Sequence, residues 1–106
     1  MSAPDVAGRW VPEGETGQAH LTLQADGTLT GHDGCNQFTG QRWLLDAEGG
    51  PDGGGVVRCH GERIQTLKAC IDVDTWLASA ETFPLDGDAL VALSSDGSVL
   101  GRLVRG

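Results

Sequence analysis

The sequence predicts an α+β domain built on an antiparallel sheet, and three observations lead to this class. Asp-Gly pairs at residues 26–27 and again at 96–97 lie between segments of alternating apolar residues, which is typical of β-hairpins. Residues 73–82 instead carry apolar side chains at helical spacing. With 106 residues, the chain has room for one domain, residues 1–106.

The first hairpin can be predicted in detail. Leu21 and Leu23 alternate with polar neighbours, a period of two that indicates a half-buried strand. A two-residue loop would place Leu29 on the wrong face. A three-residue loop, residues 25–27 with Gly27 in a left-handed conformation, pairs Leu23 with Leu29 and keeps the apolar face whole. We therefore predict the three-residue loop.

A similar sequence segment occurs again near the end of the chain. Residues 21–31 align with residues 91–101, so that both Asp-Gly turns fall at the same place. A duplication would explain the match, and so would the general likeness of hairpins of one type. Under either explanation, two antiparallel hairpins bracket the domain.

Two further strands are predicted between the hairpins, at residues 41–45 and 56–59, with Trp43 in the core. They are joined by residues 46–55, which we predict to be a flexible, glycine-rich loop. This loop is not a phosphate-binding loop, because it lacks the Gly-Lys-Ser/Thr ending and carries acidic residues.

A single helix is predicted from about residue 73 to residue 82. Asp72 is a good N-cap, and Pro84 stops the helix from continuing past Phe83. The helix should pack on the sheet through one apolar stripe. The stripe consists of Val73, Trp76, Leu77 and Ala80.

Two short motifs link the chain to a family. Residues 34–40 read Gly-Cys-Asn-Gln-Phe-Thr-Gly, and residues 66–70 read Thr-Leu-Lys-Ala-Cys. Together they resemble the META domain, also called HslJ-like. The resemblance implies a partly closed antiparallel barrel with the helix over one side. It implies no established activity, only links to envelope stress, drug tolerance and virulence. The matching residues are Gly34, Cys35, Asn36, Phe38, Gly40, Thr66 and Cys70.

We interpret these motif residues as structural. Glycine and asparagine tolerate left-handed backbone, so Gly34, Asn36 and Gly40 suit a sharp bend. The alternative is that Asn36 faces a cavity and contacts a ligand. Turn chemistry already explains the residue types, and we favour it.

Three cysteines are an odd number, which argues against a disulfide framework. Cys35 and Cys70 match the family motifs, whereas Cys59 is additional. We expect buried thiols at all three positions and a fold that needs no disulfide. A Cys35–Cys70 bridge would require Cα atoms within about 7 Å, which the sequence leaves open.

The sequence predicts no metal site, no cofactor and no catalytic set. A metal site could be assembled from His32, Cys35, Cys59, His60 and Cys70. However, Cys59 and His60 are neighbours on a predicted strand, so their side chains should point to opposite faces. No nucleophile elbow is present, and we expect a protein that is not an enzyme.

The charge limits the possible partners. Fifteen acidic residues against seven basic ones give a net charge of −8, which opposes binding to nucleic acid or to an anionic membrane. No segment approaches the roughly 18 apolar residues of a membrane span. The first residues do not form a signal peptide, so we expect a cytoplasmic protein, or an exported one if a leader has been removed.

Two functions fit these predictions. The first is a monomeric, non-catalytic interaction or structural module with an unknown protein partner, and the resemblance implies a link to stress. The second is a half-barrel that binds a small ligand in its interior. An apolar void of roughly 300 Å³ or more would support the second, and a filled interior the first.

Overall fold

The computed structural model describes residues 6–14, 19–49, 53–66, 69–70 and 76–106. Its strands are β1 (Gly8–Pro12), β2 (His20–Leu23), β3 (Thr28–His32), β4 (Gln37–Asp46), β5 (Val56–His60), β6 (Ile64–Gln65), β7 (Thr82–Asp86), β8 (Ala89–Leu93) and β9 (Val99–Arg105). Among these described residues, the one helical segment is a 3-10 turn, η1 (Trp76–Ser79).

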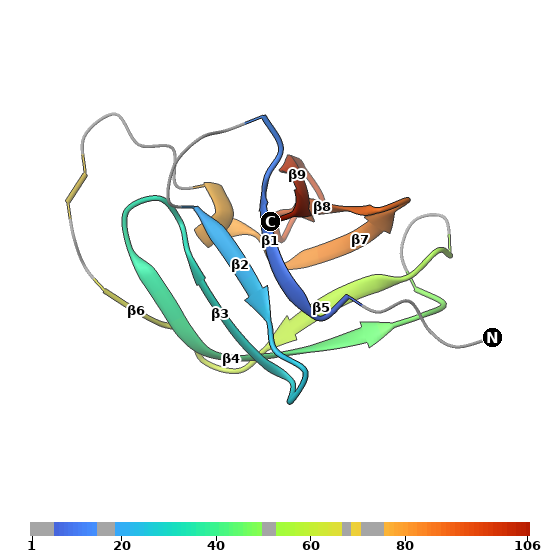
Figure 1. Cartoon of the computed structure of the whole chain (residues 1–106), viewed down its shortest axis with the longest axis horizontal. Coiled ribbons are helices and arrows are strands. Elements are labelled where there is room, and N and C mark those ends of the chain that lie inside the picture. The colour runs from blue at the N-terminus through green and yellow to red at the C-terminus, as the bar shows by residue number, and fades with distance from the viewer. Residues whose placement is uncertain (1–5, 15–18, 50–52, 67–68, 71–75) are drawn as a thin grey trace.

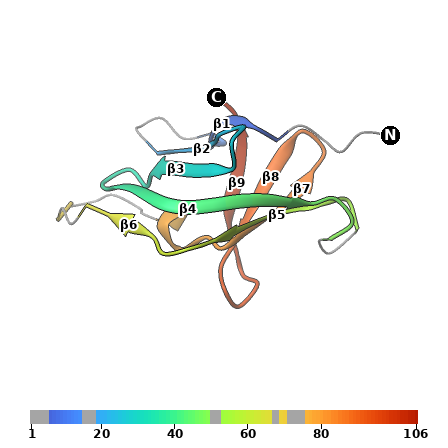
Figure 2. The ribbon, with the colours of Figure 1, turned by 90° about the horizontal axis from the view of Figure 1, so that it is seen from below.

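Eight of the strands close an antiparallel barrel in the order β1-β2-β3-β4-β5-β7-β8-β9 (Figure 1). Each strand pairs with the next one along the chain, except that the short β6 is attached beside β4. The barrel closes where β1 pairs with β9, with Trp10 opposite Arg105. Figure 2 shows β4 running along the molecule, with β3 on one side and β5 and β6 on the other.

The predicted α+β class with a partly closed sheet is therefore wrong. The structure is nearly all β and the barrel is closed. Thr82 and Pro84, expected at the end of the helix and just after it, both belong to β7, where Pro84 lies opposite Val56. The fixed φ of proline is compatible with a strand wherever its missing N–H is not needed.

The predicted α-helix over residues 73–82 is wrong, because among the described residues of this range only the 3-10 turn η1 is helical and β7 begins at Thr82. One 3-10 turn brings Leu77 and Ala80 into the core at 2% and 1% exposure and packs the half-buried Trp76 against it. The Trp76 ring lies so close to Gly101 that an added Cβ there would come within 2.7 Å of it. The predicted cap Asp72 and the stripe residue Val73 lie outside the described residues.

Both hairpins have the predicted three-residue loop. In the first, Leu23 pairs with Leu29, the Gln24 amide donates to the Thr28 carbonyl at 2.9 Å, and Gly27 has a φ of 93°. The second repeats this pattern between Ser94 and Ser98 with Gly97 at a φ of 87°. In both loops the Asp side chain accepts the backbone N–H two residues later. The register prediction is confirmed.

The central strands extend further than predicted. Strand β4 begins at Gln37 rather than at residue 41, and it carries a bulge. Leu29 pairs with Gln41 and Gly31 with Phe38, so β4 has one residue more than β3 between these pairs. Gly40 lies in this bulge with a φ of 89°. Residues 46–55 connect β4 to β5 as expected, although residues 50–52 are outside the described part.

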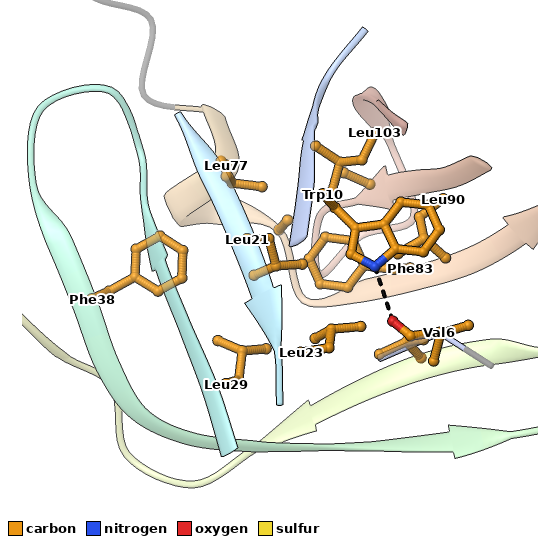
Figure 3. Packing of buried hydrophobic residues seen from close by; sticks show 13 residues of the cluster. Val6, Trp10, Leu21, Leu23, Leu29, Phe38, Leu77, Phe83, Leu90 and Leu103 are labelled. Atoms are coloured by element: carbon orange, nitrogen blue, oxygen red, sulfur yellow. Dashed lines mark hydrogen bonds between the residues drawn. The ribbon is translucent and has the colours of Figure 1, made fainter. Parts of the chain in front are cut away.

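Thirteen buried residues from all around the barrel form its core (Figure 3). Phe83, Leu23, Leu90 and Leu103 are exposed by 2% or less. Trp10 is buried as well, and its indole Nε1 donates to the Val6 carbonyl at 2.9 Å. Trp43, which was predicted to lie in the core, is only half-buried and packs against the outside of this cluster.

Across the described residues, no helix has the length and apolar character that crossing a membrane would require.

We expect Gly97→Ala to lower the free energy of unfolding by about 1–2 kcal/mol, because alanine disfavours the left-handed backbone at this position. An added Cβ would meet no atom within 4 Å, so the change measures backbone strain alone. Gly27→Ala should cost at least as much, since its Cβ would lie 2.7 Å from the Arg42 guanidinium. Urea denaturation measures both, with the exposed Ser95→Ala as control. A neutral Gly97→Ala would contradict the loop geometry.

Candidate functional site

The first family motif begins with a tight turn built around Asp33, a residue that the sequence analysis did not single out. The Asp33 carboxylate is buried and accepts the backbone N–H groups of Cys35 at 2.8 Å and Asn36 at 2.6 Å. Its own amide donates to the Asn36 carbonyl at 3.0 Å. Gly34, at the tip, has a φ of 101°, which favours glycine. The turn therefore explains why glycine stands at this point of the motif.

Asn36 and Thr66 connect the two motifs. The Thr66 hydroxyl donates to the Asn36 side-chain carbonyl at 2.9 Å and accepts the Gln37 amide at 3.1 Å. The Thr66 amide donates to the Gln37 carbonyl at 3.0 Å. Asn36 is 8% exposed, so its side chain is turned toward the protein. These contacts give both residues a role in joining segments that are 30 residues apart.

A disulfide between Cys35 and Cys70 makes the second connection between the motifs. The Cα atoms lie 6.0 Å apart, within the range that a bridge requires. The expectation of free thiols at these positions is therefore wrong. The odd number of cysteines was a poor guide, because Cys59 is simply left out of the pair.

Phe38 and Gly40 complete the first motif. The Phe38 ring lies directly over Gly31 of β3, where an added Cβ would approach it to 2.4 Å. Gly40 faces the chain just before β6, and an added Cβ would lie 2.7 Å from the Glu62 carbonyl oxygen. Both positions therefore depend on close approach between backbone and neighbouring groups. All seven motif residues lie where β3, β4 and the segment around β6 meet.

A pocket of about 530 Å³ opens beside the place where β3, β4 and the segment around β6 meet, which we call the joint. Only Val56, Val57 and Arg58 of β5 pair with β7. The pocket lies beside the remaining part of β5, after Arg58. The pocket is lined by residues from β4, β5, the turn before β6, the end of η1 and the start of β7. They are Gln41, Arg58, Cys59, His60, Gly61, Arg63, Ser79, Ala80, Glu81 and Thr82.

Arg63 is held in place in this pocket. Its Nε donates to the Gln41 side-chain oxygen at 3.1 Å, and its Nη2 donates to the Ala80 carbonyl at 3.4 Å. The guanidinium also lies over the Phe38 ring, 4.9 Å from the ring centroid. Arg63 thus ties the motif strand to the segment after η1. Its position in the sequence gives no sign of this role, because Gln41, Ala80 and Phe38 come close to it only in the folded barrel.

Cys59 forms part of the pocket wall. Burial raises the pKa of the Cys59 thiol to about 11, so the thiol is neutral at physiological pH. Its neighbour His60 is exposed, in line with the alternation of side chains along a strand. Among the described residues, no three His, Cys, Asp or Glu side chains cluster as a metal site would need.

The comparison with protein-family models gives one result that decides the family: the META domain model matches residues 3–105. The chain belongs to the META domain family. The match covers nearly the whole chain, and it confirms the resemblance inferred from the two motifs. The comparison with curated proteins gives no match, and neither does the comparison with solved structures.

We expect Thr66→Val to destabilise this META domain by about 0.5–1.5 kcal/mol, the net contribution of a typical hydrogen bond, because Thr66 is exposed. Valine removes the hydroxyl group between Asn36 and Gln37 and leaves the Asn36 side-chain carbonyl without that donor. Thr66→Ser keeps the hydroxyl and is the matched control. Chemical denaturation measures both variants, and equal stability of the two would argue against the bridging role.

Reduction of the Cys35–Cys70 bridge should lower the melting temperature by about 10 °C or more. The bridge spans 35 residues, for which the loss of crosslinking is expected to be about 2–4 kcal/mol. Calorimetry with and without reductant measures the change. Cys59→Ser should respond to reductant as the wild type does, while a Cys35→Ser, Cys70→Ser double variant should not respond. A shift of only a degree or two would show that the bridge adds little stability.

Proposed function

We propose that this META domain is a non-catalytic interaction or structural module that acts as a monomer on a protein partner, in the stress-related setting that the resemblance implies. The observation that carries the proposal is the arrangement of the family motifs. Asn36, Thr66 and the Cys35–Cys70 pair bond to one another across the joint. Residues engaged in this way support a scaffold more readily than a reaction centre.

The state of the cysteines supports the absence of catalysis. The Cys35 sulfur is bonded to Cys70, so it is not a nucleophile in this form. The Cys59 thiol is protonated at neutral pH because burial raises its pKa to about 11. Neither sulfur therefore has the character of an activated thiolate.

The filled core favours the module over the interior ligand carrier. Thirteen buried side chains occupy the described part of the barrel interior, among them Trp10, Phe38 and Phe83 (Figure 3). A ligand carrier of this size would keep a cavity there instead. Contacts with a partner would then use the outer surface, including the pocket beside Arg63.

The disulfide also bears on location. Bridges of this kind persist in oxidising compartments and are rare in a reducing cytoplasm. The Cys35–Cys70 bond therefore supports the exported location, the second of the two that the sequence left open.

Site-specific photo-crosslinking in cells tests the interaction role. A photoreactive amino acid would be placed singly at exposed positions around the barrel, among them Glu81 at the pocket rim and Ser95 at the second hairpin tip. We expect one contiguous face to give a discrete protein adduct and the remaining positions to give none. The absence of a discrete adduct from every face would contradict binding to a protein partner.

A further inference from the structure

The pocket beside Arg63 differs in charge from the chain as a whole. The protein has 15 acidic and 7 basic residues. The pocket lining contains two arginines, Arg58 and Arg63, and a single acid, Glu81. The lining of this pocket therefore carries one more positive than negative charge, in contrast to the acidic protein as a whole, and a positively charged pocket attracts anions.

The position of Arg63 is suited to recognition. Its bonds to Gln41 and Ala80 and its contact with the Phe38 ring hold the guanidinium at the pocket wall. A group held in place in this way loses little conformational entropy when a ligand binds. Its Nε and Nη2 already donate to protein oxygens, so Arg63 would attract a bound anion through its positive charge.

The rest of the lining is compatible with an anion. The hydroxyls of Ser79 and Thr82, which also line the pocket, can offer hydrogen bonds. Cys59 adds no negative charge, because its thiol is neutral at physiological pH. Arg58 lies 3.8 Å from Asp46 in a half-exposed pair, an interaction weak enough to leave its charge effective at the rim.

We propose that this pocket binds a carboxylate group, with Arg63 as the fixed cation and Arg58 as a second cation at the rim. The inference rests on the proposed interaction function and names the chemistry that the surface recognises. A singly charged carboxylate suits a lining with two arginines and one glutamate better than a phosphate dianion does. The carboxylate comes either from a free organic acid or from the end of a polypeptide.

A nuclear magnetic resonance titration of the oxidised 106-residue chain tests the proposal with benzoate and the uncharged benzamide. Benzoate should shift the backbone amide signals of Gln41, Cys59, Gly61 and Thr82, and benzamide should not. Raising the salt concentration to about 1 M should weaken benzoate binding, because the attraction at the rim is screened. Equal binding of benzoate and benzamide would overturn the proposal.

Three variants locate the binding group. Arg58→Gln should weaken benzoate binding about fivefold, the effect of losing one nearby charge in water. Arg9→Gln is the matched control, because it removes the same charge from β1, on the far side of the barrel order from β5. Glu81→Gln should strengthen binding. Benzoate binding that responds alike to Arg58→Gln and Arg9→Gln would overturn the site.

Arg63→Gln removes the fixed positive charge and should weaken binding more than Arg58→Gln does. Its amide spectrum must first match the wild type, since Arg63 also supports the fold. If that variant does not fold, the comparison of Arg58→Gln with Arg9→Gln still decides the question.

A short peptide with a free carboxyl terminus and the same peptide with an amidated terminus separate the two sources. Tighter binding of the free-acid peptide than of benzoate assigns the pocket to a polypeptide end, and weaker binding assigns it to a small organic acid. Both results require that the amidated peptide fails to bind. If no carboxylate binds while photo-crosslinking still yields a protein adduct, the pocket proposal fails and the interaction function stands.

Discussion

The pairing of the first strand with the last is the constraint on which the rest of the structure depends. Strand β1 contributes one edge to β2 and the other to β9, so the eight-stranded barrel has no gap (Figure 1). Trp10 of β1 is buried with its indole N–H bonded to Val6, and the Arg105 guanidinium of β9 lies 4.3 Å from the centroid of its ring. Closure therefore satisfies the strand edges and buries the largest side chain of β1 in the same step.

Strand β4 sets a second constraint, because it must serve three neighbours. It pairs with β3 along one edge, and with β5 and β6 in succession along the other (Figure 2). The bulge at Gly40 allows this, since it shifts the side-chain alternation so that both Phe38 and Trp43 pack toward the core. The family motifs gather around this bulge. The Thr66 hydroxyl and the disulfide hold the β6 segment against it.

The sequence predicted the features that depend on local chemistry. Alternation around Leu23 and the left-handed glycines determined the hairpin loops and their register. Non-local features escaped it. Helical spacing over a few residues cannot distinguish a 3-10 turn from an α-helix, and Pro84 suggested a stop where a strand runs. In the site, motif resemblance identified Asn36 and Thr66. Arg63 and Asp33 could be recognised only once folding had brought their partners together.

The pocket is a consequence of the same geometry. Strand β5 pairs with β7 only as far as Arg58, while its pairing with β4 continues to His60. After Arg58, β5 has no paired strand on the β7 side among the described residues. The segment following η1 lies near this part of β5 instead. Arg63 spans this opening, from Gln41 on β4 to the Ala80 carbonyl. A ligand bound there would contact both sides of the opening. The contacts that hold the META motifs together therefore also hold the residues that line the neighbouring pocket.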